Sequence, residues 1–120
     1  MKTILVVDDD AGVRESLVVV LRENFDIMTA ANGRDALKCM ETVIFDAIVL
    51  DVTMPFVDGE GVLAAMRRRN IGTPVVLASA LPDLRARAAR LGVAYIEKPY
   101  DFDKFEALLK RLTAPHAAPS

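Results

Sequence analysis

The sequence has little that would build a disulfide framework, a membrane segment or a nucleic-acid-binding surface. Its 120 residues contain one cysteine, Cys39, so no internal disulfide can form, as is usual in reducing compartments. No apolar run approaches the ~20 residues that a membrane-spanning helix needs, and acidic residues follow the first apolar run too soon for a signal peptide. The formal net charge of -2 provides no basic field for nucleic acid. We therefore expect a cytoplasmic protein that binds neither membrane nor nucleic acid directly.

The composition is that of one globular domain. Hydrophobic residues make up 52% of the chain, and its length suffices for a domain with its own core. The final stretch, TAPHAAPS, shows no periodicity. We expect a domain over residues 1–113 and a disordered tail or the start of a linker over residues 114–120. The tail slightly favours a piece of a longer protein over a single-domain one.

Five short apolar runs, rich in β-branched residues, predict strands that are buried on both faces, as in a parallel sheet. They cover residues 3–7, 25–30, 46–50, 74–78 and 93–97. Segments with apolar residues at helical spacing follow each run. This (βα)5 alternation predicts an α/β fold, in which a doubly wound five-stranded parallel sheet carries helices on both faces.

Single residues mark the expected helix ends. Asp10 suits the cap of the first helix, and NGRD at 32–35 suits a turn into the second. Pro82 suits the first turn of the fourth helix, and Gly92 suits its C-terminus.

The segment ILVVDDD, residues 4–10, places three carboxylates at the end of a buried strand. At 4 Å and an effective dielectric constant near 20, each pair of unit charges repels by roughly 4 kcal/mol. A cation must therefore lie among these groups, or one of them must stay protonated.

Polar side chains also follow three other predicted strands, and ligands of open α/β sheets bind at the carboxyl ends of the strands. Taken singly, each is a common turn, cap or solvated charge, but together they favour a site. Carboxylates suit Mg²⁺, a lysine and a hydroxyl suit phosphoryl oxygens, and an aspartate beside them can accept a phosphoryl group. The residues are Asp8, Asp9 and Asp10 after the first strand, Asp51 after the third, Ser79 after the fourth and Lys98 after the fifth.

The chain resembles a response-regulator receiver domain of the CheY-like kind over residues 2 to about 113. The motifs that carry the resemblance are ILVVDDD, IVLDVTMPFVDG, VVLASA and YIEKPY, in this order. The resemblance implies a flavodoxin-like fold with strand order 2-1-3-4-5. It also implies a phosphorylation-controlled switch of a two-component system or phosphorelay, rather than an enzyme. The phosphodonor would be a sensor histidine kinase or a histidine phosphotransfer domain.

The resemblance also implies roles for individual residues. Asp51 matches the phosphoacceptor. Mg²⁺ would be bound directly by Asp9 and Asp51, largely through water by Asp8, and by the main-chain carbonyl of Thr53. Ser79 matches the hydroxyl residue that moves toward the phosphoryl group, Lys98 the lysine that pairs with it, and Tyr95 the aromatic residue that swings with the hydroxyl residue. The Lys98–Pro99 peptide bond is expected to be cis.

Three departures from the family pattern stand out. Serine replaces the commoner threonine at position 79, which should preserve the hydrogen bond. Lys98 follows Ser79 by 19 positions (98 - 79), a few fewer than is typical, so a short or displaced fourth helix is expected to alter the usual output surface. Leu81 is apolar where polar residues often lie near the phosphoryl group, and we expect it to restrict attacking water and prolong the phosphorylated state.

Competing functions remain at this point. In a haloacid-dehalogenase-type phosphatase, Asp8 would be the nucleophile and Asp10 the acid/base, but no later acidic pair follows Lys98 in a suitable strand context, and the chain is short for that fold. The GEGVLA segment at 59–64 fits a dinucleotide-binding pattern, but VTMPFVD separates it from the third strand. A degenerate receiver would act as a protein-binding module without phosphorylation. The sequence does not identify the cognate kinase or the output, and it is compatible with homodimerisation on phosphorylation.

Overall fold

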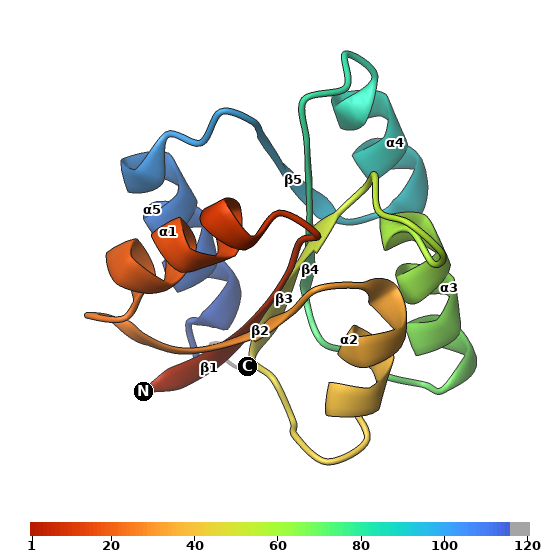
Figure 1. Ribbon diagram of the computed structural model, residues 1–120, viewed down its shortest axis with the longest axis horizontal. Coiled ribbons are helices and arrows are strands. Elements are labelled where there is room, and N and C mark those ends of the chain that lie inside the picture. The colour runs from red at the N-terminus through yellow and green to blue at the C-terminus, as the bar shows by residue number, and fades with distance from the viewer. Residues whose placement is uncertain (116–120) are drawn as a thin grey trace, which may run out of the picture.

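The computed structural model describes residues 1–115 as one α/β unit in which strands and helices alternate (Figure 1). Residues 116–120 of the predicted tail lie outside the described residues. The elements are β1 Lys2–Val7, α1 Ala11–Leu21, β2 Phe25–Ala30, α2 Gly33–Cys39, β3 Ala47–Asp51, α3 Gly59–Arg68, β4 Val75–Ser79, α4 Leu84–Leu91, β5 Ala94–Glu97 and α5 Phe102–Thr113.

The strands form one parallel sheet in the order β2-β1-β3-β4-β5, which confirms the predicted fold. Helices α1 and α5 cover one face, and α2, α3 and α4 cover the other (Figure 1). Successive strand residues point to opposite sides of the sheet, and both sets are apolar, so both faces are apolar. Leu5 and Leu50 pack toward α2, α3 and α4, whereas Val6 and Val49 pack toward α1 and α5. Each of these four side chains is at most 1% exposed.

The predicted helix signals are largely confirmed. The Asp10 side chain caps α1 by accepting hydrogen bonds from two backbone N–H groups, and Asn32 caps α2. Gly92 ends α4 in the left-handed conformation, with φ of 70°. The prediction for Pro82 is wrong: α4 begins at Leu84, and Pro82 lies in the turn before it.

Two ion pairs hold the short helix α4 against α3. Glu60, in the first turn of α3, accepts hydrogen bonds from Arg87 at 2.6 Å and from Arg90 at 2.9 Å. Helix α4 has eight residues, and β5 has four. None of the helices within residues 1–115 is both long enough and apolar enough to cross a membrane.

Candidate functional site

The sheet register gathers the polar strand ends at one edge. Val7 of β1 pairs with Leu50 of β3, so Asp8 and Asp51 are the next residues on adjacent strands. On the other side, β4 ends at Ser79. The Lys98 N–H donates to the Ser79 carbonyl at 2.9 Å and so extends the pairing of β4 with β5 by one residue. The predicted site residues of four strands therefore meet in one place.

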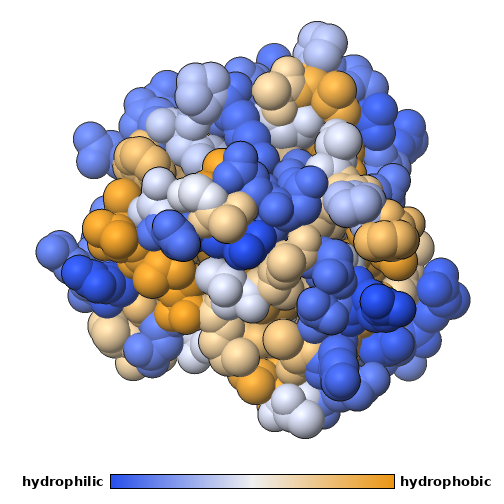
Figure 2. All heavy atoms as spheres, in the orientation of Figure 1, coloured by the Kyte–Doolittle hydropathy of each residue, from blue (hydrophilic) through white to orange (hydrophobic). Residues whose placement is uncertain are grey.

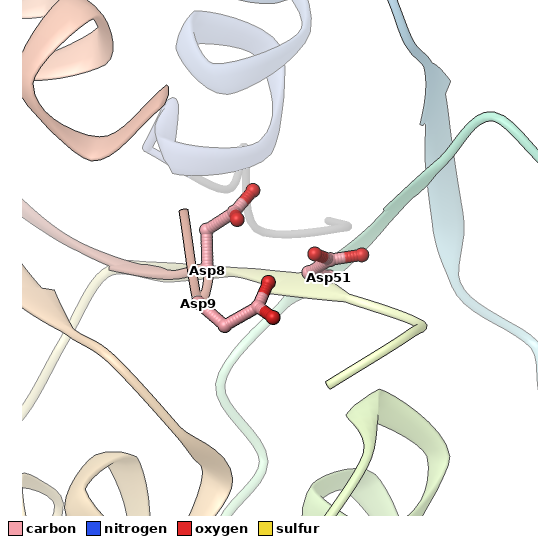
Figure 3. Close-up of side chains that lie close together, drawn as sticks. All are labelled: Asp8, Asp9 and Asp51. Carbon is pink, nitrogen blue, oxygen red and sulfur yellow. The ribbon is translucent and has the colours of Figure 1, made fainter. Parts of the chain in front are cut away.

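Three carboxylates form the acidic part of the site. One oxygen each from Asp8, Asp9 and Asp51 lies within 4.8 Å of the others. Figure 3 shows the Asp9 carboxylate directed toward Asp51, with Asp8 beside them. Asp8 is 2% exposed and Asp51 6%, whereas Asp9 is exposed. A set of hard oxygen donors that is open on one side fits Mg²⁺, which retains several waters when it binds proteins.

Asp10 does not join this cluster. Its carboxylate accepts from the backbone N–H groups of Gly12 at 2.9 Å and Val13 at 3.2 Å, which makes it the cap of α1. Its own N–H donates to the Asp8 carboxylate at 2.9 Å and fixes that side chain. The third acid of the DDD segment is therefore structural.

Lys98 supplies the positive charge that the cluster requires. Its ammonium group lies 2.8 Å from Asp8 Oδ2 and 3.3 Å from Asp51 Oδ2. Burial raises the pKa of Asp51, Lys98 lowers it, and the neighbouring Asp8 charge raises it again, so the net shift is upward. Burial alone would lower the pKa of Lys98, but hydrogen bonds and charge from Asp8 and Asp51 outweigh it, and that pKa is also raised. A single lysine thus offsets only part of the negative charge.

An Asp51→Asn variant is expected to be more stable than the wild type at neutral pH when Mg²⁺ is removed with EDTA. The folded-state pKa of Asp51 lies above its ordinary value, so ionisation destabilises the fold at higher pH. This cost in unfolding free energy is fully present above the folded-state pKa. It is relieved as the pH falls from the folded-state pKa to the unfolded-state pKa. Thermal unfolding should give the variant the higher Tm near neutral pH and a shrinking difference toward about pH 3.

Addition of Mg²⁺ serves as the control for this effect. The ion should raise the Tm of the wild type more than that of the variant, because the variant lacks one carboxylate ligand. Equal Tm values at every pH in EDTA would show that the Asp51 charge imposes no cost on the fold.

A cleft of about 290 Å³ opens beside Asp51. The Ser79 hydroxyl accepts a hydrogen bond from the Leu81 N–H at 2.9 Å, and the Thr53 N–H donates to Asp51 Oδ1 at 3.2 Å. The Ser79 side chain is buried, and Leu81 is 36% exposed at the rim. The lining residues are Asp51, Thr53, Ser79, Ala80, Leu81 and Lys98.

Tyr95 is not among the residues that line this cleft, but it lies on the same face of the sheet as Ser79. Tyr95 pairs with Leu77, and Ser79 is two residues further along β4, so the two side chains point to one side. The Tyr95 ring is partly buried against the core beneath α3 and α4. The Lys98–Pro99 peptide bond is cis, as predicted.

Helix α3 begins directly against the end of β3. A Cβ atom placed on Gly59 would lie 2.5 Å from the main-chain oxygen of Asp51 and 3.1 Å from Val52 Cα. The Gly59 N–H also donates to the Val52 carbonyl at 3.2 Å. Glycine is therefore required at the first position of α3, because a side chain would push the helix away from Asp51.

Sequence reasoning gave no role to Tyr100, although it belongs to the YIEKPY motif. Its ring faces the Lys98 ammonium at 5.9 Å from the ring centroid. An aromatic residue two positions after the lysine was the available signal, but sequence alone does not say to which side the ring turns.

Comparisons with known proteins agree with this fold. Residues 4–110 match the family model of the response regulator receiver domain. The transcriptional regulatory protein PrrA of Mycobacterium bovis is 38% identical over 113 residues, which cover 91% of this chain and 48% of PrrA. TcrA of Mycobacterium tuberculosis is 37% identical over 92% of this chain and 45% of its own length. This chain thus spans about half the length of these curated relatives.

Solved structures show the same likeness. The receiver domain of the Francisella response regulator 1452 superposes with a TM-score of 0.88 at 32% identity, covering 94% of this chain and 97% of that one. The Thermotoga maritima response regulator protein TrrA, solved in complex with Mg²⁺ and beryllofluoride, gives a TM-score of 0.84 at 33% identity and covers 93% and 99% of the two chains.

Proposed function

Because this chain belongs to the family of response regulator receiver domains, we propose that Asp51 accepts a phosphoryl group from a phosphohistidine. Receiver domains act as signalling switches of two-component systems and not as classical enzymes. The observation that carries the proposal is the position of Asp51. Its carboxylate touches Lys98, lies within reach of Asp8 and Asp9, and lines an open cleft. We assign the receiver domain to residues 1–113.

The transfer needs little covalent chemistry from the protein beyond the acceptor itself. A carboxylate oxygen of Asp51 bonds to phosphorus as the phosphorus–nitrogen bond of the phosphohistidine breaks, and the imidazole leaves. Lys98 keeps a positive charge at the acceptor for the phosphoryl oxygens. Asp8, Asp9, Asp51 and the Thr53 carbonyl would hold Mg²⁺, which when bound neutralises charge on the transferring oxygens.

The proposed switch links Ser79 to Tyr95. In the described structure the Ser79 hydroxyl oxygen accepts from the Leu81 N–H, and its own O–H is the group that would donate to a phosphoryl oxygen on Asp51 when Ser79 moves toward it. Tyr95 shares the sheet face of Ser79 and would fill the space that this movement opens. The change would reach the surface around α4, β5 and α5 and so control an output partner or domain, or a homodimer contact.

The phosphodonor would be a sensor histidine kinase or a histidine phosphotransfer domain that contacts α1. Figure 2 shows apolar atoms at the surface on the left of the view, over α1. On this helix the Val19 side chain is 58% exposed and would form part of such a contact.

The two other catalytic or ligand-binding interpretations lose support. In the phosphatase interpretation Asp10 would serve as acid/base, but its carboxylate is occupied in capping α1. In the dinucleotide interpretation Gly59 would follow a strand directly, but the segment 52–58 intervenes after β3. The degenerate receiver remains the second candidate, and phosphorylation itself separates it from the proposal.

Incubation with acetyl phosphate and Mg²⁺ should add one phosphoryl group to the intact protein, as measured by mass spectrometry. EDTA and the Asp51→Asn variant should each abolish the gain, whereas Asp58→Asn, which removes the charge of an exposed aspartate but keeps a capping oxygen for α3, should retain it. A wild type that gains no mass and does not bind beryllofluoride would favour the degenerate receiver.

Leu81 is expected to lengthen the life of the phosphorylated form. Its side chain stands at the rim of the cleft that contains Asp51, where it excludes water from the phosphorus. A Leu81→Asn or Leu81→Glu variant should lose phosphate several-fold faster, because a polar group there can orient an attacking water. The decay of phosphorylated protein after removal of the donor measures this, and an unchanged half-life would contradict it.

A further inference from the structure

Lys98 faces an aromatic ring as well as two carboxylates. Its ammonium nitrogen lies 5.9 Å from the centroid of the Tyr100 ring. This separation is within the range over which an aromatic face attracts a cation. The Lys98 side chain is 22% exposed, so water screens the contact only in part.

Tyr100 is itself held firmly. Its ring meets Phe105 edge-on, with centroids 4.9 Å apart, and Phe105 is fully buried in the core beside α1 and α5. The Phe102 ring lies further off, at 6.4 Å between centroids, and is 38% exposed, so it contributes little to this support. The Tyr100 ring therefore has a fixed position relative to the sheet, and it can limit the movement of the flexible Lys98 side chain beside it.

A lysine needs such a support at this site. Its four-carbon stem is flexible, and its ammonium group binds equally well in many directions. At present the carboxylates of Asp8 and Asp51 hold the ammonium group. When Asp51 is phosphorylated, these carboxylates would bind the phosphoryl group and Mg²⁺, so they cannot fix the lysine throughout the transfer. The Tyr100 ring binds neither Mg²⁺ nor the phosphoryl group, so its contact with Lys98 can persist through the transfer.

We propose that Tyr100 is a positioning residue that holds the Lys98 ammonium group against the phosphoacceptor through its ring face. The inference rests on the proposed phosphorylation of Asp51. Burial and the negative charges of Asp8 and Asp51 raise the pKa of the Tyr100 hydroxyl, so the ring carries no charge of its own at neutral pH. The ring face carries the effect, and the hydroxyl is dispensable.

The test compares Tyr100→Phe, which keeps the ring, with Tyr100→Leu, which removes it. Phosphorylation by acetyl phosphate at saturating Mg²⁺ should be within twofold of the wild type for the first variant and roughly three- to tenfold slower for the second. Phe102→Leu, which removes another aromatic ring from the same cluster, should react at the wild-type rate. In a Lys98→Ala background the change at Tyr100 should have no further effect.

Several results would overturn the inference. Tyr100→Leu could react as fast as the wild type, Tyr100→Phe could be as slow as Tyr100→Leu, or Tyr100→Leu could slow the Lys98→Ala protein as much as the wild type. Each would show that the ring does not act through Lys98. A wild type that is not phosphorylated at all would instead refute the proposed function.

Nuclear magnetic resonance gives a second measurement that needs no phosphorylation. The ε-methylene protons of Lys98 should show a ring-current displacement, relative to exposed lysines such as Lys104, in the wild type and in Tyr100→Phe. The displacement should vanish in Tyr100→Leu. Its absence from the wild type, or its persistence in Tyr100→Leu, would refute the contact even where the Lys98→Ala reaction is too slow to follow.

Discussion

A Gly59→Ala variant is expected to lose about 3 kcal/mol of unfolding free energy, because the new methyl group collides with the main chain of the acceptor strand. The added Cβ would lie 2.5 Å from the Asp51 carbonyl oxygen, a separation that neither backbone can relieve without moving. Alanine favours helices over glycine by at most about 1 kcal/mol, so the collision outweighs the gain in propensity. Helix α3 must shift, and Asp51 must shift with it.

Gly72→Ala is the matched control. Nothing lies within 4 Å of a Cβ at that position, so its stability should stay close to that of the wild type. Urea unfolding of the three proteins measures the difference, and the phosphorylation rate of Gly59→Ala should fall as well. A Gly59→Ala protein of wild-type stability would show that α3 does not pack directly on the Asp51 backbone.

A Lys98→Ala variant is expected to accept phosphate from acetyl phosphate about 100-fold more slowly than the wild type. Lys98 is the only cation that the described residues place in contact with both Asp8 and Asp51. Without it, no side-chain cation within residues 1–115 contacts Asp51 to offset the charge that arrives on the phosphoryl oxygens. Saturating Mg²⁺ would replace only part of the positive charge that Lys98 supplies.

The matched control for Lys98 is Lys104→Ala, which removes an exposed lysine of α5 and should leave the rate unchanged. Intact mass against time gives both rates. If Lys98→Ala reacted within twofold of the wild type while Asp51→Asn did not react, the acceptor would stand but the role of Lys98 would be wrong.

The fold was predictable because local and global signals agree in this chain. Each of the five apolar runs became a strand with bounds shifted by at most one residue, since a strand buried on both faces allows little besides β-branched and aliphatic side chains. The caps at Asp10 and Asn32 were equally readable, because a side-chain oxygen beside free N–H groups acts locally.

The site was predictable as a set of residues but not as a geometry. Parallel strands bring their carboxyl ends to one edge, which explains why Asp8, Asp51 and Lys98 meet. The sequence does not reveal that Lys98 contacts both carboxylates, that Ser79 binds the Leu81 N–H, or that Tyr100 lies beside the ammonium group. These contacts depend on side-chain directions that only tertiary packing decides.

One local prediction near the site failed. Pro82 was expected inside α4, but a turn in which the Leu84 N–H donates to the Leu81 carbonyl delays the start of the helix. The residue at which a helix near the site begins depends on the conformation of the preceding loop, and the sequence predicts loop conformation only weakly.

The measurement that tests the account most directly is the location of the phosphoryl group after reaction with acetyl phosphate and Mg²⁺. Borohydride reduces an aspartyl phosphate to homoserine, which peptide mass spectrometry can place in the sequence. The account predicts homoserine at position 51 and nowhere else. Homoserine at position 8 would point to the phosphatase interpretation, and its absence from every position would contradict the claim that Asp51 is the phosphoacceptor.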